Sequence, residues 1–241
     1  MKHTFLLIIS VFIFLFLGCK TESGTEDIYP ERPEWSQKNG TPLDSSTFYF
    51  PTSIKTPDSI INTKLDTFKL TWYSTSLFPT KQPVLYNYYL GHDIYRLTVL
   101  RSFNPPLVFT LHKDGKNVWL QTIKLDRIPQ FIPMRILSNF PPKPDDRDSI
   151  IYPDRHANIE QNSRKNLTIE SWNNLEACLS KIKYWQMSPS NDDFGLDGSR
   201  WILEAHTKER YWMVERWSPK GDLRNCANYL VELSTIKEEM Y

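Results

Sequence analysis

The sequence predicts an α+β domain in which two C-terminal helices pack on one face of an antiparallel sheet. Between residues 66 and 123, short runs alternate apolar and polar side chains, as half-buried strands do. Two later stretches carry apolar residues at the 3.6-residue spacing of an amphipathic helix, and a second pair of strand-like runs lies between them. The predicted order is strands, helix, hairpin and helix, in one domain that spans residues 61–241.

The predicted strands of the first half share this alternation and cover residues 66–73, 94–100, 107–112 and 118–123. Asp114-Gly115 connects the last two, and Asp-Gly between strand-like runs is a strong hairpin signal. Residues 126–165 are rich in proline, so we predict a long loop there, to which residues 131–137 add a short edge strand.

The C-terminal elements follow from two apolar faces. After Thr168, one face carries Trp172, Leu175, Cys178, Leu179 and Ile182, and the last helix carries Leu223, Cys226, Leu230 and Leu233. Residues 201–206 and 211–217 are the predicted hairpin between the helices. Because Cys178 and Cys226 both lie on core-facing stripes, a disulfide between them is one prediction, and two buried free thiols are the alternative.

The N-terminus has the layout of a secretory signal. A basic start is followed by an apolar run to Gly18, which is shorter than the ~20 residues of a membrane-spanning helix. The run ends at Leu15-Phe16-Leu17-Gly18-Cys19, which resembles the cleavage box of bacterial lipoproteins, although the family usually has Leu where Phe16 stands. The resemblance implies that residues 1–18 are removed and that Cys19 carries acyl chains such as palmitate. An uncleaved signal anchor and an ordinary signal peptide are the alternatives.

Residues 19–60 are predicted to tether the domain to that lipid. Prolines stand there among Ser, Thr, Asp and Glu, with few apolar groups to offset the entropy of ordering. We therefore expect a protein of the bacterial envelope that is lipid-anchored to the outer membrane and faces the periplasm or the cell surface.

The composition argues against several classes of partner and cofactor. The chain has 29 basic and 28 acidic residues, and removing residues 1–18 removes one Lys, which leaves 28 of each. This balance gives no electrostatic basis for binding nucleic acid. The sequence holds no glycine-rich phosphate-binding motif, and neither Cys178 nor Cys226 has a second ligand at zinc spacing. We therefore predict no cofactor and no metal.

The candidate binding surface comprises the second hairpin and the turn before it, with Asp197, Glu204, His206 and Arg216. Alternation places Glu204 and His206 on one face of their strand, as acid–base chemistry needs. A solvated face with a cross-strand Glu–Arg pair is the interpretation that we favour. His92-Asp93 is a second candidate base, for which a turn before a strand is the favoured interpretation.

Two blocks resemble an uncharacterised family of secreted or lipid-anchored proteins from Bacteroidota-type bacteria. The first is residues 84–96 (VLYNYYLGHDIYR) with 107–113 (LVFTLHK), and the second is residues 195–204 (GLDGSRWILE) with 216–219 (RWSP). The resemblance covers roughly residues 65–237 and implies an envelope compartment and one domain, but no activity. Such bacteria can O-glycosylate an Asp-Ser-apolar triplet, so it also implies Ser59 and Ser149 as candidate sites.

Taken together, the sequence predicts a non-catalytic binding or assembly module of the envelope, with an envelope protein or a glycan as partner. The second hypothesis is a hydrolase of glycan or peptidoglycan that acts through Asp197 and Glu204.

Overall fold

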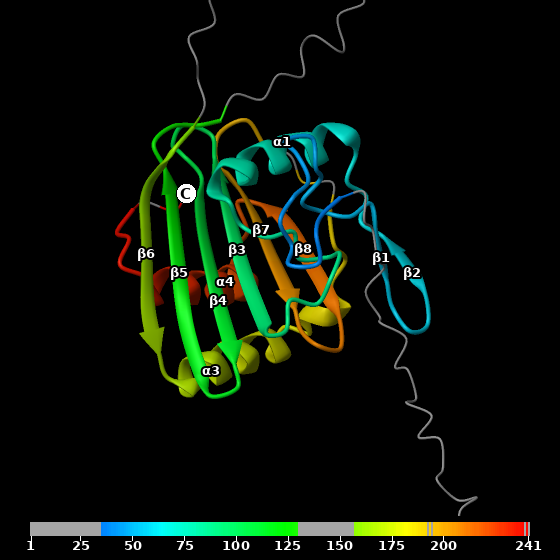
Figure 1. Ribbon diagram of the computed structural model, residues 1–241, viewed down its shortest axis with the longest axis vertical. Helices are drawn as coiled ribbons and strands as arrows, with labels where there is room; N and C mark the ends of the chain where they lie inside the picture. Colours follow the sequence, from blue (N-terminus) through cyan, green and yellow to red (C-terminus); the bar gives the residue numbers. More distant parts are fainter. Residues whose placement is uncertain (1–34, 130–156, 192, 194, 239, 241) are drawn as a thin grey trace, which may run out of the picture.

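The computed structural model describes residues 35–129, 157–191, 193, 195–238 and 240 (Figure 1). A six-stranded antiparallel sheet in the order β6-β5-β4-β3-β7-β8 forms its centre, and β1 and β2 form a separate two-stranded sheet. The strands are β1 (Ser53–Lys55), β2 (Ile60–Asn62), β3 (Asp93–Arg101), β4 (Leu107–Asp114), β5 (Asn117–Leu125), β6 (Ile159–Leu167), β7 (Ser199–His206) and β8 (Tyr211–Trp217). The helices are α1 (Thr67–Leu77), α3 (Ile169–Lys181) and α4 (Gly221–Leu233), with short 3₁₀ turns η1 (Phe78–Thr80) and η3 (Tyr184–Gln186).

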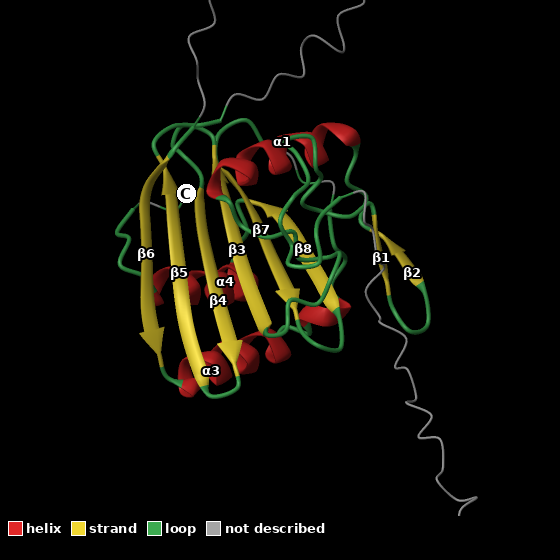
Figure 2. Cartoon of the chain, in the orientation of Figure 1, coloured by secondary structure: helices red, strands yellow, loops and turns green. Residues whose placement is uncertain are grey.

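The predicted α+β class and antiparallel sheet are confirmed, and the predicted element order is correct in part. Helices α3 and α4 pack against β5, β4 and each other, behind the sheet in Figure 2. Their inward side chains include Trp172, Leu175 and Leu230, none of which exposes measurable surface. Burial of these apolar groups drives the packing. Among the described residues, no helix is long and apolar enough to span a bilayer.

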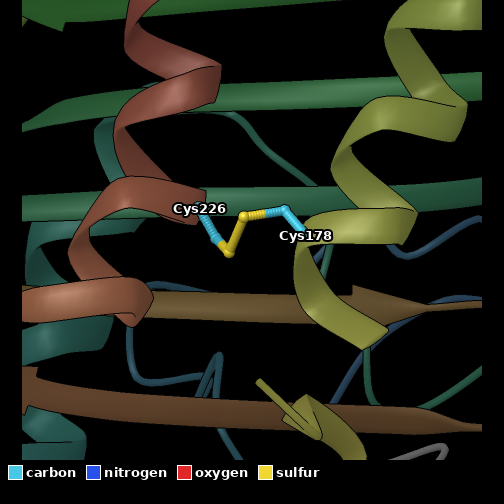
Figure 3. The surroundings of a disulfide bond; sticks show 2 residues. All are labelled: Cys178 and Cys226. Carbon is cyan, nitrogen blue, oxygen red and sulfur yellow. A yellow bond between two sulfur atoms is a disulfide. The ribbon is translucent and has the colours of Figure 1, made fainter. Parts of the chain in front are cut away.

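A disulfide joins the two C-terminal helices, which agrees with the first of the two alternatives drawn from the sequence. The bond links Cys178 of α3 to Cys226 of α4, with a Cα–Cα distance of 5.6 Å (Figure 3). Each cysteine lies on the apolar side of its helix, and Cys226 is fully buried. The bond therefore crosses the gap between two helices that both rest on the sheet.

Residues 66–73 form the start of α1, so the predicted strand there is wrong. The Asp66 carboxylate accepts a hydrogen bond from the Lys69 backbone N–H at 2.8 Å and caps the helix. The buried positions Leu70, Tyr73 and Leu77 recur at helical spacing. These eight residues resemble a strand in sequence because the strand and helix periods place apolar residues at several of the same positions.

The domain also begins earlier than predicted. Residues 35–60 were assigned to the tether, but Tyr49, Phe50 and Ile54 are buried in the core. The Tyr49 N–H donates to Ser74 Oγ of α1 at 2.9 Å, and Asn87 Nδ2 donates to Ser36 Oγ at 2.8 Å. The aromatic residues of this proline-rich stretch supply the apolar area that the tether interpretation assumed to be missing. Residues 19–34 lie outside the described part of the chain.

The predicted loop at 126–165 contains a strand at its end. Ile159–Leu167 form β6, which pairs with β5 along its length and is an edge of the sheet. Its sequence IEQNSRKNL has few apolar residues, because most of its side chains face solvent. Residues 130–156, with Ser149 and the expected strand at 131–137, lie outside the described residues. Ser59 lies in the exposed turn between β1 and β2.

The two faces of the sheet differ in chemistry. The face under α3 and α4 carries mainly apolar side chains, such as Leu97, Phe109 and Leu203. We call the opposite face the polar face; it carries Arg96, Thr110, Gln121, Glu204 and Glu215. Residues 35–92 cover its β3–β7–β8 side (Figure 1) and reach β5 through η1 and Gln82, whereas the side chains of β6 on this face stay exposed. The polar face is therefore buried at one side and open at the other.

A candidate binding site on the polar face of the sheet

Glu204 is buried on the polar face and is engaged by two donors. The Arg96 Nε donates to Glu204 Oε2 at 2.6 Å, and the Tyr211 hydroxyl donates to Oε1 at 3.0 Å. Neither charged side chain of this pair exposes any surface. Burial and the neighbouring Glu204 carboxylate raise the pKa of Tyr211 well above its ordinary value, so the phenol stays a donor.

Glu215 forms a second buried cluster on the same face. Its carboxylate accepts hydrogen bonds from Arg200 Nη1 at 2.6 Å, Ser190 Oγ at 2.6 Å and Lys69 Nζ at 3.0 Å. The lysine comes from α1, so the cluster ties the covering segment to the last strand of the sheet. Burial with three donors makes this carboxylate a structural anion.

Both ring nitrogens of His206 are used by the covering segment. His206 Nδ1 is 2.7 Å from the Leu85 carbonyl oxygen, and Nε2 accepts from the Leu90 N–H at 3.0 Å. The Tyr89 ring stacks on the imidazole with centroids 5.3 Å apart. Burial lowers the pKa of His206 to about 4, which keeps the ring neutral. A ring that is fixed on both sides is not placed to take a proton from a substrate.

The structure does not bring the four predicted surface residues together. Asp197 is exposed in the turn before β7, whereas Glu204 and His206 are buried. The register pairs Glu204 with Met213 and Trp201 with Arg216, so Glu204 and Arg216 lie on opposite faces. The favoured interpretation of a solvated face is therefore wrong, although Glu204 does form a cross-strand Glu–Arg pair, with Arg96 of β3 in the interior. Arg216 donates instead to the carbonyl oxygens of Glu215 and Ser188.

The two buried histidines predict how stability depends on pH. Burial lowers the pKa of His206 to about 4 and that of His112 to about 3, below the 6.5 of an exposed histidine. The unfolded chain then binds more protons, so the free energy of unfolding should fall as pH drops from about 6.5 to 4, by up to about 3 kcal/mol for His206. Urea unfolding at several pH values measures this slope. We expect His206→Gln to flatten it, and an unchanged slope in that variant would contradict the assignment.

The uncovered side of the polar face carries an exposed polar strip. We call Trp119, Gln121, Asn162, Arg164 and Asn166 the β5–β6 strip. The register pairs Trp119 with Asn166 and Gln121 with Arg164, and places Asn162 opposite Ile123. All five therefore point to the same side of the sheet, and each is at least partly exposed.

Aromatic stacking fixes one end of this strip. The Arg164 guanidinium lies 4.4 Å from the centroid of the Trp119 ring, and Trp119 stacks on His112 at 4.7 Å with an interplanar angle of 6°. His92 Nε2 is 2.9 Å from His112 Nδ1. Burial, and then the nearby His92 and Arg164, lower the pKa of His112 to about 3, so a neutral imidazole supports the tryptophan. Residues from β4, β5, β6 and the turn before β3 thus converge on one stack.

A directed chain of hydrogen bonds fixes the middle of the strip. Thr110 Oγ1 donates to Gln82 Oε1 at 2.8 Å, Gln82 Nε2 donates to Gln121 Oε1 at 3.1 Å, and Gln121 Nε2 donates to Asn162 Oδ1 at 3.0 Å. Bonds that run in one direction polarise one another. The chain therefore leads from the buried sheet to the exposed amide of Asn162.

The strip adjoins a surface cavity. Its volume is about 880 Å³, and its lining includes Lys81, Gln82, Phe78, Asn158 and Ile159. Gln82 connects the two features, because it lines the cavity and its amide donates to Gln121 of the strip. Ile159 and Trp119 stand near opposite ends of β6 and β5, so the strip and cavity extend over about 20 Å of strand.

The sequence did not reveal the strip. Trp119 and His112 lie in correctly predicted strands, and the abundance of aromatic residues made exposed tryptophans a general candidate for binding. Arg164 and Asn162, however, fall in the stretch that we predicted to be a loop. The register of β6 supplies the missing information, because it places these residues beside Trp119 and Gln121.

Within the described ranges, no three His, Cys, Asp or Glu side chains gather where they could hold a metal ion. No known family model, curated protein or solved structure matches this chain.

Proposed function

We propose that this chain is a lipid-anchored protein of the bacterial envelope whose domain binds a glycan on the β5–β6 strip without cleaving it. The signal-like N-terminus and Cys19 support the location in the envelope, as does the resemblance to secreted and lipid-anchored envelope proteins. The observation that carries the binding role is the strip itself: its arginine is held on Trp119, and its amides are ordered by hydrogen bonds. Amide groups offer a donor and an acceptor together, which suits neighbouring sugar hydroxyls.

The placement of the carboxylates favours binding over hydrolysis. Glycoside hydrolysis uses two carboxyl groups about 5–9 Å apart, on either side of the scissile bond. Glu204 is buried against Arg96, and Asp197 is exposed in the turn before β7. The strand from Ser199 to Glu204 alone spans roughly 17 Å, so the two carboxylates do not flank one sugar linkage.

Co-sedimentation with purified peptidoglycan sacculi tests this role with the full chain in mild detergent. We expect the protein to sediment with the sacculi and to release no soluble fragments. Trp119→Ala should reduce the bound fraction, because it removes the support of Arg164, whereas Phe103→Ala, at an exposed aromatic residue outside the strip, should not. Equal binding by both variants would contradict the site. Fragment release that Glu204→Gln abolishes would establish the hydrolase instead.

A separate experiment tests the proposed lipid anchor on Cys19. Cys19→Ser should leave the protein unacylated and move it from the membrane fraction to the soluble fraction, because acyl chains supply about 0.8 kcal/mol of membrane affinity per buried CH₂. Fractionation after a salt wash, with intact mass of the purified protein, measures both effects. The Cys178–Cys226 disulfide should still form, which shows that the variant was exported. A Cys19→Ser protein that stays fully membrane-bound would overturn the proposed anchor.

A further inference from the structure

We infer that the β5–β6 strip recognises an acidic group, so that its ligand is a polysaccharide that carries carboxylates or phosphates. The inference rests on the proposed function and adds the chemical class of the ligand. Arg164 is the group that would bind the anion.

The setting of Arg164 differs from that of the buried arginines. Arg96, Arg101 and Arg200 each pair with a carboxylate at 2.6 Å. In the part of the chain that the structure describes, Arg164 has no carboxylate partner, and its side chain is exposed. An arginine uses a planar fork of N–H donors to bind carboxylate or phosphate oxygens in pairs.

The stack holds this arginine ready for a ligand. One side of the Trp119 ring rests on His112, and the guanidinium lies over the ring at 4.4 Å. Stacking restricts a side chain that otherwise has many rotamers, so less conformational entropy is lost when an anion binds. Among the described residues, none accepts a hydrogen bond from the Arg164 guanidinium, so its N–H groups stay available to a ligand.

The rest of the strip and the adjoining cavity favour an anionic chain over a neutral one. The strip residues contain one cation and no acid, and the same holds for the described residues that line the cavity, where Lys81 is the cation. Arg164 and Lys81 therefore stand on one continuous surface, with the amides of Gln121 and Asn162 between the arginine and the cavity. An extended polymer that carries acidic groups separated by hydroxyls matches this sequence of cation, amides and cation along the surface.

Three polymers with the same backbone test whether the strip prefers carboxylate, phosphate or no charge on its ligand. The probes are dextran, carboxymethyl-dextran and phosphorylated dextran, and the readout is the dissociation constant of the full chain in low salt. We expect at least one charged dextran to bind ten-fold or more tightly than dextran, and the arm that binds more tightly identifies carboxylate or phosphate as the preferred group.

Two neighbouring substitutions distinguish a site from a general charge effect. Arg164→Gln should weaken binding of the charged dextran by about 10- to 100-fold, the range expected for charged hydrogen bonds. Lys165→Gln removes the same charge one residue away, where the lysine points to the other face and bonds the Leu233 carbonyl oxygen. Its effect should be small. Arg164→Lys should recover only part of the affinity, since a lysine keeps the charge and loses the fork.

Several outcomes would overturn the inference. Equal binding of charged and uncharged dextran would do so, as would equal losses in Arg164→Gln and Lys165→Gln. If the proteins also sediment with sacculi in a Trp119-dependent way, the proposed glycan binding stands and only the preference for acid fails. If sedimentation with sacculi fails as well, the proposed function fails with it.

Discussion

Replacing Glu204 with leucine while Arg96 is kept should lower the free energy of unfolding by about 3–5 kcal/mol. The substitution leaves the Arg96 guanidinium, which exposes no surface, without its carboxylate. It also removes the acceptor of the buried Tyr211 hydroxyl. Urea unfolding followed by tryptophan fluorescence measures the loss, and the midpoint should shift without a large change in slope.

Two further variants test that the loss comes from an uncompensated buried charge. Arg96→Met combined with Glu204→Leu should recover most of the stability, because an apolar pair of similar volume replaces the ion pair. Glu160→Leu should cost less than about 1 kcal/mol, since Glu160 pairs with Lys124 at the surface and is about half exposed. Similar losses for Glu160→Leu and Glu204→Leu would show that burial is not the cause.

Removing the disulfide should produce the second large effect. Cys178→Ala combined with Cys226→Ala should lower the free energy of unfolding by about 4 kcal/mol, because the bond closes a loop of 48 residues in the unfolded chain. The same unfolding experiment measures this difference. Reduction of the parent protein should lower its stability by a similar amount.

The accessibility of the thiols provides the control. Cys226 is fully buried between α4 and the sheet. Because both sulfurs are held in the disulfide, a thiol reagent should not label Cys178 or Cys226 of the oxidised protein in denaturant, and should label both after reduction. A double variant as stable as the parent would mean that the two helices are held without the bond.

The C-terminal helices were predictable because each buries one apolar stripe and exposes the other side. Alternation predicted β4, β5, β7 and β8 for the same reason. It failed for α1, where eight residues fit both periods and the Asp66 cap decides for the helix. It also failed for β6, whose exposed side chains leave no apolar pattern.

The candidate site was harder to predict, because it depends on which polar residues are buried. Alternation correctly placed Glu204 and His206 on one face, but it could not reveal that a segment from the start of the chain covers that face. Glu204 therefore looked solvated, and its partner Arg96 lies 108 residues away. Only the pairing of distant strands identifies which charges are neutralised and which, like Arg164, stay exposed.

The cover over the polar face has a consequence for how the chain folds. The contacts that hold it join residues far apart in sequence: Lys69 and Glu215 are separated by 146 residues, and Leu90 and His206 by 116. Contacts between residues so far apart in the sequence form late and slow the folding of a domain. During synthesis the N-terminal segment emerges first, and its long-range contacts cannot form before the last hairpin is made. In the export that we propose for this chain, the domain would therefore close only after its final residues have crossed the membrane.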